Sequence, residues 1–191
     1  MNYPDLKRSE LPASTATASS TICVSEVLHN VHRRKVRAIP SLPSFYYYCY
    51  MYLIQALAEY EKMSDEVVAT EDMLREWIFE KKKAEVLLVS EERVEVGFAL
   101  FFHSFSTFLG RAGIYLEDLF VLPEYRGRGY GKALLKRLAE ITEERGCGRL
   151  EWACLDWNKP SIEFYMSLGA KPMDIWTTYR LTGDTLKKMA N

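Results

Sequence analysis

A glycine-rich loop carries the clearest chemical signal in this sequence. The stretch EYRGRGYGKALL, residues 124–135, places three glycines directly before an apolar pattern of helical spacing. Glycines at the start of a helix let backbone N–H groups approach an anion closely, and the helix dipole adds positive potential there. The loop therefore has two interpretations: a cradle for a phosphate or pyrophosphate group, or a glycine-rich turn with exposed arginines.

Two common phosphate-binding loops do not fit this stretch. A Walker loop needs Ser or Thr after its glycine–lysine pair, but Ala133 follows Lys132, and the first glycine is missing at the required distance. A dinucleotide-binding G-x-G-x-x-G fingerprint also fails, because the three glycines are spaced two and two and the preceding strand follows a hairpin. The pattern that remains is R-x-x-G-x-G, from Arg126 to Gly131.

A pair of acids lies just upstream, inside an apolar segment. Glu117 and Asp118 interrupt the stretch RAGIYLEDLFVL, residues 111–122. Burying a carboxylate is costly unless the group is paired or used. Strand alternation predicts that the two acids point to opposite faces. For Asp118 we expect a structural role, in capping or pairing.

Composition excludes several classes of protein. The 191 residues fit one domain with a tail, and 25 Lys plus Arg against 26 Asp plus Glu give no reason to expect nucleic acid or an acidic membrane as partner. The four cysteines form no C-x-x-C pair, so neither a zinc site nor a disulfide framework is expected. His29 and His32 lack further metal-ligand partners in sequence. We predict a reduced, cytoplasmic protein without a bound metal.

The N-terminal part of the chain differs from the rest. Residues 11–21, LPASTATASST, are small and polar, which predicts a disordered tail over residues 1–34 and a folded domain over residues 35–191. The start of the chain has no secretory signal pattern. The aromatic run from Phe45 to Ile54 is too short to span a bilayer, and we interpret it as a buried or interface face of a helix.

Apolar periodicity and turn residues predict the elements that position these groups. Strands are expected at residues 35–39, 84–90, 96–102, 111–122, 149–157 and 177–181, and helices at residues 45–62, 70–82, 129–144 and 160–168. The strands at 84–90 and 96–102 form a hairpin, and Gly146 and Gly169 end helices. The order predicts a mixed α+β fold of the α/β type, with helices on both faces of a central, mostly antiparallel mixed sheet.

This succession of motifs strongly resembles the GNAT N-acetyltransferases. Within that superfamily it is most similar to the spermidine/spermine (diamine) acetyltransferases and their thialysine-acetylating relatives. The matching pieces are LAEYEKM, VVATEDML, VGFALFF, YLEDLFV, RGRGYGKALL, WNKPSIEFY and TTYRL, which span residues 57–182. The R-x-x-G-x-G loop is shared across GNAT enzymes, whereas the combination of YLEDLFV with WNKPSIEFY is more specific. The resemblance implies the GNAT fold, acetyl-CoA as the acetyl donor and a homodimer.

The resemblance also implies roles for individual residues. It makes Tyr165 the general acid that protonates the coenzyme A thiolate. It places Glu117 in the acceptor site, either as the group that takes the amine proton through water or as a binding group. The residues implied to line the acceptor site are Tyr60, Glu61, Glu117, Glu151, Trp152 and Ala153. A solvated helix end at Tyr60 and ordinary strand packing at Glu151 are the alternatives.

The same resemblance implies a set of acetyl-CoA-binding residues. The set comprises backbone groups of Leu119, Phe120 and Val121, the loop residues Arg126, Gly127, Arg128, Gly129, Tyr130, Gly131 and Lys132, and Asn158, Lys159, Pro160 and Ser161. An Asn at a strand end offers both a donor and an acceptor to the pantetheine amide. Asn158 is equally suited to capping the helix that begins at Pro160, and both roles are compatible.

We therefore predict transfer of an acetyl group from acetyl-CoA to a primary amine of a small acceptor by direct attack in a ternary complex. Family acids are replaced here by Ser106 and Thr107 before YLED and by Thr177 near the end of the domain. Fewer carboxylates attract a long polycation less strongly. The acceptor is then a thialysine-like or diamine compound at least as readily as spermidine. The alternatives are an enzyme acting on a protein or peptide amine, and a non-catalytic acetyl-CoA-binding module.

Overall fold

The protein is described by a computed structural model that covers residues 34–38 and 44–191. Apart from Arg34, the tail predicted over residues 1–34 lies outside the described residues. The chain divides into two compact units, residues 1–153 and residues 154–191. The first unit holds the sheet with three helices, and the second holds two further helices.

The first unit is built on a five-stranded sheet with the strand order β1-β2-β3-β4-β5. Its strands are β1 (Arg34–Ala38), β2 (Glu85–Glu91), β3 (Val94–Ser106), β4 (Arg111–Val121) and β5 (Leu150–Trp152). Neighbours from β1 to β4 are antiparallel, and β5 is parallel to β4. The mixed, mostly antiparallel sheet and the hairpin of β2 and β3 are thus confirmed. The strand predicted over residues 149–157 is much shorter than expected.

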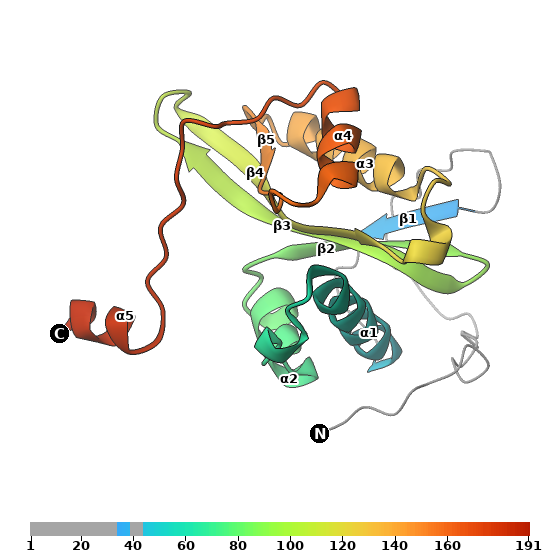
Figure 1. The fold of residues 1–191 in the computed structure, drawn as a ribbon, viewed down its shortest axis with the longest axis horizontal. Helices are drawn as coiled ribbons and strands as arrows, with labels where there is room; N and C mark the ends of the chain where they lie inside the picture. The colour runs from blue at the N-terminus through green and yellow to red at the C-terminus, as the bar shows by residue number, and fades with distance from the viewer. Residues whose placement is uncertain (1–33, 39–43) are drawn as a thin grey trace. The chain divides into compact units, whose positions relative to one another are not determined.

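Helices cover both faces of this sheet, as predicted. Figure 1 shows α1 (Ser44–Glu61) and α2 (Glu71–Leu74) on one face and α3 (Tyr130–Glu144) on the other. On the first face, the ring of Tyr50 packs edge-on against Phe98 with centroids 5.1 Å apart. On the second face, Leu134 and Leu138 are completely buried. Short helical turns η2 (Ser64–Glu66) and η4 (Pro123–Tyr125) complete the unit.

The helix predicted over residues 70–82 begins as the sequence indicates. The Thr70 hydroxyl accepts a hydrogen bond from the Met73 amide over 3.2 Å, which satisfies one N–H group of the first turn of α2. The helix continues with wider π geometry in η3 (Arg75–Glu80). Among the described residues, no helix combines the length and apolar character that crossing a bilayer requires.

The second unit contains α4 (Lys159–Ser167) and α5 (Gly183–Ala190). Gly169 has a φ of 89°, which is the left-handed conformation that commonly ends a helix. The strand predicted at residues 177–181 is wrong: these residues are exposed and pair with no strand among the described residues. The β-propensity of Thr and Tyr forms a strand only where a neighbouring strand supplies hydrogen bonds.

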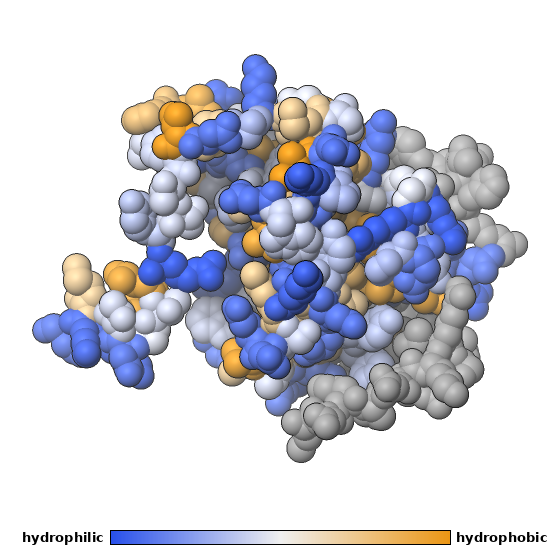
Figure 2. Space-filling view, viewed as in Figure 1, coloured by the Kyte–Doolittle hydropathy of each residue, from blue (hydrophilic) through white to orange (hydrophobic). Residues whose placement is uncertain are grey.

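The helix α5 was not predicted from the sequence. Leu186 and Met189 expose 52% and 77% of their surface. Figure 2 shows hydrophobic and hydrophilic side chains on different sides of this helix. The second unit therefore ends in an amphipathic helix whose apolar side is uncovered.

Candidate active site

A β-bulge in β4 lies where the sequence shows its acidic pair. Leu100 of β3 pairs with Asp118, but the next residue, Phe101, pairs with Leu116. Glu117 is therefore an extra residue without a partner on β3. A bulge of this kind bends the strand and re-aims its side chains, and bulges are common beside active sites.

The bulge removes the regular alternation on which the prediction of opposite faces for the two acids rests. Phe98 faces α1, because its ring contacts Tyr50. The next two residues on that face of β3 pair with Asp118 and Tyr115. Asp118 and Tyr115 thus share the α1 face although they are three positions apart. Simple alternation failed here because it assumes an uninterrupted ladder.

Three carboxylates influence one another around this bulge. Burial raises the pKa of Asp118 to about 6, and the negative charges of Glu117 and Glu61 contribute to the shift. Burial also raises the pKa of Glu61. Among the described residues, Asp118 has no hydrogen bond or ion pair, so the capping or pairing role expected for it has no partner. Such a cluster is suited to binding an ammonium group and to taking up its proton.

The end of α1 brings its two predicted acceptor residues to this part of the sheet. The Tyr60 ring lies 6.3 Å from the ring of Phe120, which is almost fully buried on the α1 face of β4. Glu61 is the last residue of α1, and its charge acts on Asp118. Tyr60 and Glu61 therefore lie beside the acidic cluster rather than at a fully solvated helix end.

The predicted acceptor residues of β5 are positioned by parallel pairing with β4. Glu151 is opposite Tyr115, and Trp152 is opposite Leu116. The charges of Glu117 and Glu151 both raise the pKa of Tyr115, after the larger effect of burial. The Glu151 carboxylate also pairs with the Arg149 guanidinium at 2.6 Å. Its negative charge is thus partly compensated, and Ala153 directly follows the end of the strand.

Beyond Leu116, β4 has a strand neighbour on one side only within the first unit. The Phe120 carbonyl points toward β3, where a Cβ on Gly97 would lie 2.5 Å from its oxygen. The Val121 carbonyl points away from β3 and accepts a hydrogen bond from Arg126 Nε over 2.9 Å. Alternation places the backbone groups of Leu119 on the same outer side. Leu119 and Val121 are therefore the members of the predicted backbone set that face outward.

The glycine loop leads directly into α3. Gly127 and Gly129 have φ values of 72° and 83°, and Gly129 is the N-cap of α3. These left-handed conformations require glycine. The amides from Gly127 to Gly129 make no backbone hydrogen bond within the described part of the chain. Those of Gly131 and Lys132, in the first turn of α3, have no intrahelical acceptor. The loop has the free N–H groups that an anion cradle needs.

The arginines of the loop are engaged by the protein itself. The Arg128 guanidinium donates to Glu91 over 3.1 Å and to the Glu124 carbonyl over 2.9 Å. The Arg126 guanidinium lies 4.2 Å above the Tyr60 ring. Both arginines are exposed, as the interpretation of a glycine-rich turn expects, but both are also held by contacts with the protein.

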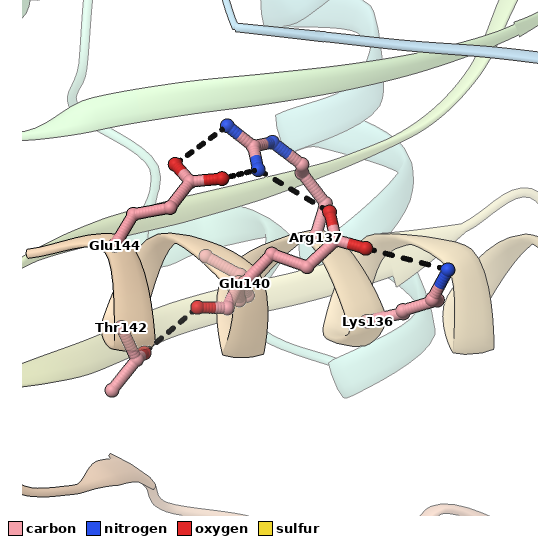
Figure 3. Close-up of polar contacts among 6 residues, drawn as sticks. Lys136, Arg137, Glu140, Thr142 and Glu144 are labelled. Atoms are coloured by element: carbon pink, nitrogen blue, oxygen red, sulfur yellow. Dashed lines mark hydrogen bonds and ion pairs between the residues drawn. The ribbon is translucent and has the colours of Figure 1, made fainter. Parts of the chain in front are cut away.

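Most charges on α3 are also paired with one another. Figure 3 shows Arg137 bonded to Glu140 and Glu144, and Lys136 bonded to Glu140. Lys132, in the first turn, makes no hydrogen bond or ion pair among the described residues. It is the cation of the loop that remains available to an anionic ligand.

In the second unit, the residues around the start of α4 have the predicted local structure. Asn158 is the N-cap, and its side chain accepts a long hydrogen bond of 3.4 Å from the Ser161 amide. Pro160 lies in the first turn, where its missing N–H costs nothing. The capping role proposed for Asn158 is confirmed.

Tyr165 lies in the second half of α4. Its ring is half-buried and lies 5.4 Å from that of Phe164. Its carbonyl accepts from the amides of Leu168 and Ala170, which closes the end of the helix. The backbone around Tyr165 is therefore fixed, and its side chain is supported by a neighbouring ring.

The expectations from the sequence about metal ligands and cysteines can be compared only with the residues that the structure describes. Within residues 34–38 and 44–191, no group of three or more His, Cys, Asp or Glu side chains could hold a metal ion. Cys49, Cys147 and Cys154 carry free thiols. Burial raises the pKa of Cys49 to about 11, so its thiol stays protonated at neutral pH. The histidine pair at residues 29 and 32 lies outside the described residues.

Sequence reasoning missed three features of this site: the bulge at Glu117, the raised pKa of Asp118 and the stacking of Arg126 on Tyr60. The acidic pair inside an apolar strand was a usable signal for the first two. The stacking joins residues far apart in the chain, and no local pattern indicates it.

Known proteins resemble this chain in sequence and in structure. The chain is 40% identical over 150 residues to the thialysine N-epsilon-acetyltransferase of Bos taurus. The aligned region covers 72% of this chain and 88% of that protein. It is 31% identical over 149 residues to the spermidine/spermine N(1)-acetyltransferase-like protein 1 of Homo sapiens, over 72% of this chain and 21% of that protein.

A solved structure of an integron cassette protein from the mobile metagenome of V. cholerae has the same fold. It matches with a TM-score of 0.69 and 27% identity, over 84% of this chain and 99% of that one. The model of the acetyltransferase (GNAT) family matches residues 50–170, a range that contains the bulge, the glycine loop and Tyr165. The chain therefore belongs to the GNAT family of acetyltransferases.

Proposed function

We propose that this enzyme transfers the acetyl group of acetyl-CoA to a primary amine of a small acceptor, by direct attack in a ternary complex. The observation that carries the proposal is the layout of β4 and the loop after it. The bulge gathers unpaired carboxylates, and a few residues later the loop presents free backbone N–H groups. One element thus offers sites for an ammonium group and for an anion.

The residues present fit acetyl-CoA. The loop amides and the Lys132 ammonium suit the pyrophosphate, and the outward backbone groups of Leu119 and Val121 suit the amides of an extended pantetheine chain. In the second unit we assign Asn158, Lys159, Pro160 and Ser161 to the same ligand, on the basis of their family pattern. When bound, acetyl-CoA supplies the thioester that is attacked.

The chemistry requires three proton transfers: two from the amine nitrogen, before and after the attack, and one to the leaving sulfur. Glu117 orients the protonated amine and takes up its proton, directly or through water, which leaves a nitrogen lone pair free to attack the thioester carbonyl. Asp118 is suited to share this task because its pKa of about 6 lies near neutral pH. As the C–S bond breaks, the Tyr165 hydroxyl gives its proton to the leaving thiolate. The nitrogen, which is positively charged after the attack, loses its second proton through water, and this proton restores the Tyr165 hydroxyl.

We propose a small acceptor such as thialysine, lysine or a diamine. The Ser106 hydroxyl, where polyamine enzymes tend to have an acid, accepts a hydrogen bond from the Leu109 amide over 3.2 Å and so serves the β3–β4 turn. Thr177 is exposed in the second unit and adds no charge. The carboxylates that remain are Glu61, Glu117, Asp118 and the partly compensated Glu151, which suits a short acceptor better than a long polycation.

A panel of amines assayed with acetyl-CoA tests the proposal. We expect coenzyme A release with thialysine or lysine at least as fast as with spermidine and spermine. A strong preference for spermine contradicts the small acceptor. Faster acetylation of a peptide amine supports the protein-modifying alternative. Binding of acetyl-CoA without release by any amine supports a non-catalytic module.

The role of Tyr165 has a separate test. Tyr165→Phe should lower turnover about 100-fold, because general acid catalysis commonly contributes that much, while acetyl-CoA binding is kept. Tyr179→Phe is a matched control, because Tyr179 is an exposed tyrosine of the same unit. Equal turnover in the two variants would remove Tyr165 from the mechanism.

We also propose a homodimer, which the exposed apolar side chains of the second unit support. Ile175 and Trp176 expose 87% and 70% of their surface, and a second copy would cover such groups. Light scattering after size exclusion should give twice the chain mass. The variant Trp176→Glu should shift the mass toward the monomer, and a monomeric wild-type protein contradicts this proposal.

A further inference from the structure

The side chain of Arg126, the first residue of the R-x-x-G-x-G pattern, is turned toward the protein and not toward the free amides of the loop. Its Nε donates to the Val121 carbonyl over 2.9 Å. Its guanidinium lies 4.2 Å from the centroid of the Tyr60 ring and 5.5 Å from that of Phe120. The three contacts lie on two separate elements, the end of α1 and the end of β4.

This geometry differs from that of an arginine held ready for a phosphate. A planar guanidinium within 6 Å of an aromatic ring gains electrostatic attraction from the ring face. The hydrogen bond to Val121 fixes the direction of the guanidinium, and the nearer of its two ring neighbours is Tyr60. The position of Arg126 at the entry to the loop makes it a link between the loop and the last turn of α1.

We propose that Arg126 is a positioning residue that connects the end of α1 to the end of β4. This connection keeps the acceptor residues of α1 and the acetyl-CoA loop in a fixed position relative to each other. This inference rests on the proposed function for its effect on ligands. Tyr60 then has a role beyond lining the acceptor site: its ring keeps the glycine loop in its binding conformation through Arg126.

The inference predicts an effect on the ligand that Tyr60 is not expected to touch. Acetyl-CoA binding is measured by calorimetry without any acceptor. Tyr60→Leu removes the ring face and should weaken this binding about fivefold, which lies within the range of a cation–π contact. Tyr60→Phe keeps a ring face and should bind acetyl-CoA within about twofold of the wild type. A residue that only lines the acceptor site would leave acetyl-CoA binding unchanged in both variants.

A matched control comes from the same helix. Tyr52 is an exposed tyrosine of α1 at 46% exposure, and it is not among the residues that we propose to hold Arg126 or a ligand. Tyr52→Leu should leave acetyl-CoA binding within about twofold of the wild type. Weakening as large as that of Tyr60→Leu would attribute the effect to general loss of α1 packing and overturn the inference.

Arg126→Met supplies an independent arm. It should weaken acetyl-CoA binding to a degree similar to Tyr60→Leu, and the double variant should be no worse than either single variant, because residues in contact are not additive. Additive losses in the double variant, or acetyl-CoA binding by Tyr60→Leu that matches the wild type, overturn the inference.

Urea unfolding separates this inference from the proposed function. Without any ligand, Tyr60→Leu, Arg126→Met and the double variant should show losses in the free energy of unfolding that do not add up, because the contact between the two side chains is present in the free protein. A wild-type protein that binds no acetyl-CoA contradicts the proposed function, while non-additive unfolding still supports the link. Additive unfolding contradicts the link itself.

Discussion

The bulge at Glu117 and the glycine loop after β4 lie close together in the chain, yet they leave different groups unpaired. At the bulge, the carboxylates have few partners: Asp118 is unpaired among the described residues and has a pKa raised to about 6. In the loop, the arginine side chains are engaged with Glu91, Val121 and Tyr60, whereas the backbone amides are free.

The difference predicts which substitutions each region is sensitive to. A site made of side chains loses its chemistry when one carboxyl group is replaced, although the backbone stays the same. A site made of backbone amides is insensitive to side-chain charge but depends on φ values that only glycine adopts easily. The predictions below separate these two dependences.

The largest effect is expected at the bulge. Glu117→Gln should lower turnover about 100-fold at pH 7, because the variant cannot take up the proton of the amine. Acetyl-CoA binding should not change, since the loop amides are intact. The rate of coenzyme A release checks the first point and calorimetry the second. Glu59→Gln, an exposed acid of α1, is the control, and an equal loss there would contradict a special role for the bulge.

A smaller effect is expected in the loop. Gly129→Ala forces a side chain into a left-handed conformation at a cost of about 1–2 kcal/mol, and relief of that strain distorts the amides. Acetyl-CoA affinity should fall about tenfold, which corresponds to 1.4 kcal/mol. Gly110→Ala is a matched control, because Gly110 also has a positive φ of 63° but lies in the β3–β4 turn with open space around it. Equal affinities in the two variants would contradict the cradle.

The smallest effect is expected at Asp118, where a substitution should increase the free energy of unfolding instead of causing a loss. Because the folded state raises the pKa of Asp118 from 3.8 to about 6, folding favours the neutral carboxyl group. The stability that the neutral group contributes is present below about pH 4 and is lost as pH rises through 6.

Asp118→Asn should therefore stabilise the protein above pH 6, by up to about 2 kcal/mol, and by much less near pH 4. Urea unfolding at several pH values measures this. Asp65→Asn, an exposed aspartate, should show no such pH dependence. A pH-independent gain in Asp118→Asn would mean that removing the carboxylate charge is not its cause.

The sequence predicted the loop better than the bulge, and the reason is physical. Gly127, Gly129 and the following apolar pattern encode a local conformation, so the glycine turn and the helix after it followed from a few adjacent residues. The bulge depends on the register between β3 and β4, which strand propensity does not specify. Most elements of the first unit were predicted for the same local reasons, including the N-cap at Thr70.

The second unit shows the converse. Residues 177–181 have the composition of a strand but form none, because strand formation depends on a partner that the local sequence does not contain. The cap at Asn158 needs only residues three positions apart and was predicted correctly. Hydrogen bonds between residues close in the chain could thus be predicted from the sequence, whereas strand pairing between distant segments could not.

The register between β3 and β4 also shows that Glu117 makes this part of β4 one residue longer than the part of β3 that pairs with it. Leu116 and Asp118 pair with Phe101 and Leu100, which are adjacent in β3. A chain with Glu117 deleted would keep every one of these pairs and gain an unbroken ladder. A deletion in the middle of a strand usually shifts all later side chains to the other face, but here it leaves them in place. Glu117 is in this sense an insertion that the strand pairing does not need and to which we assign a role in acetyl transfer.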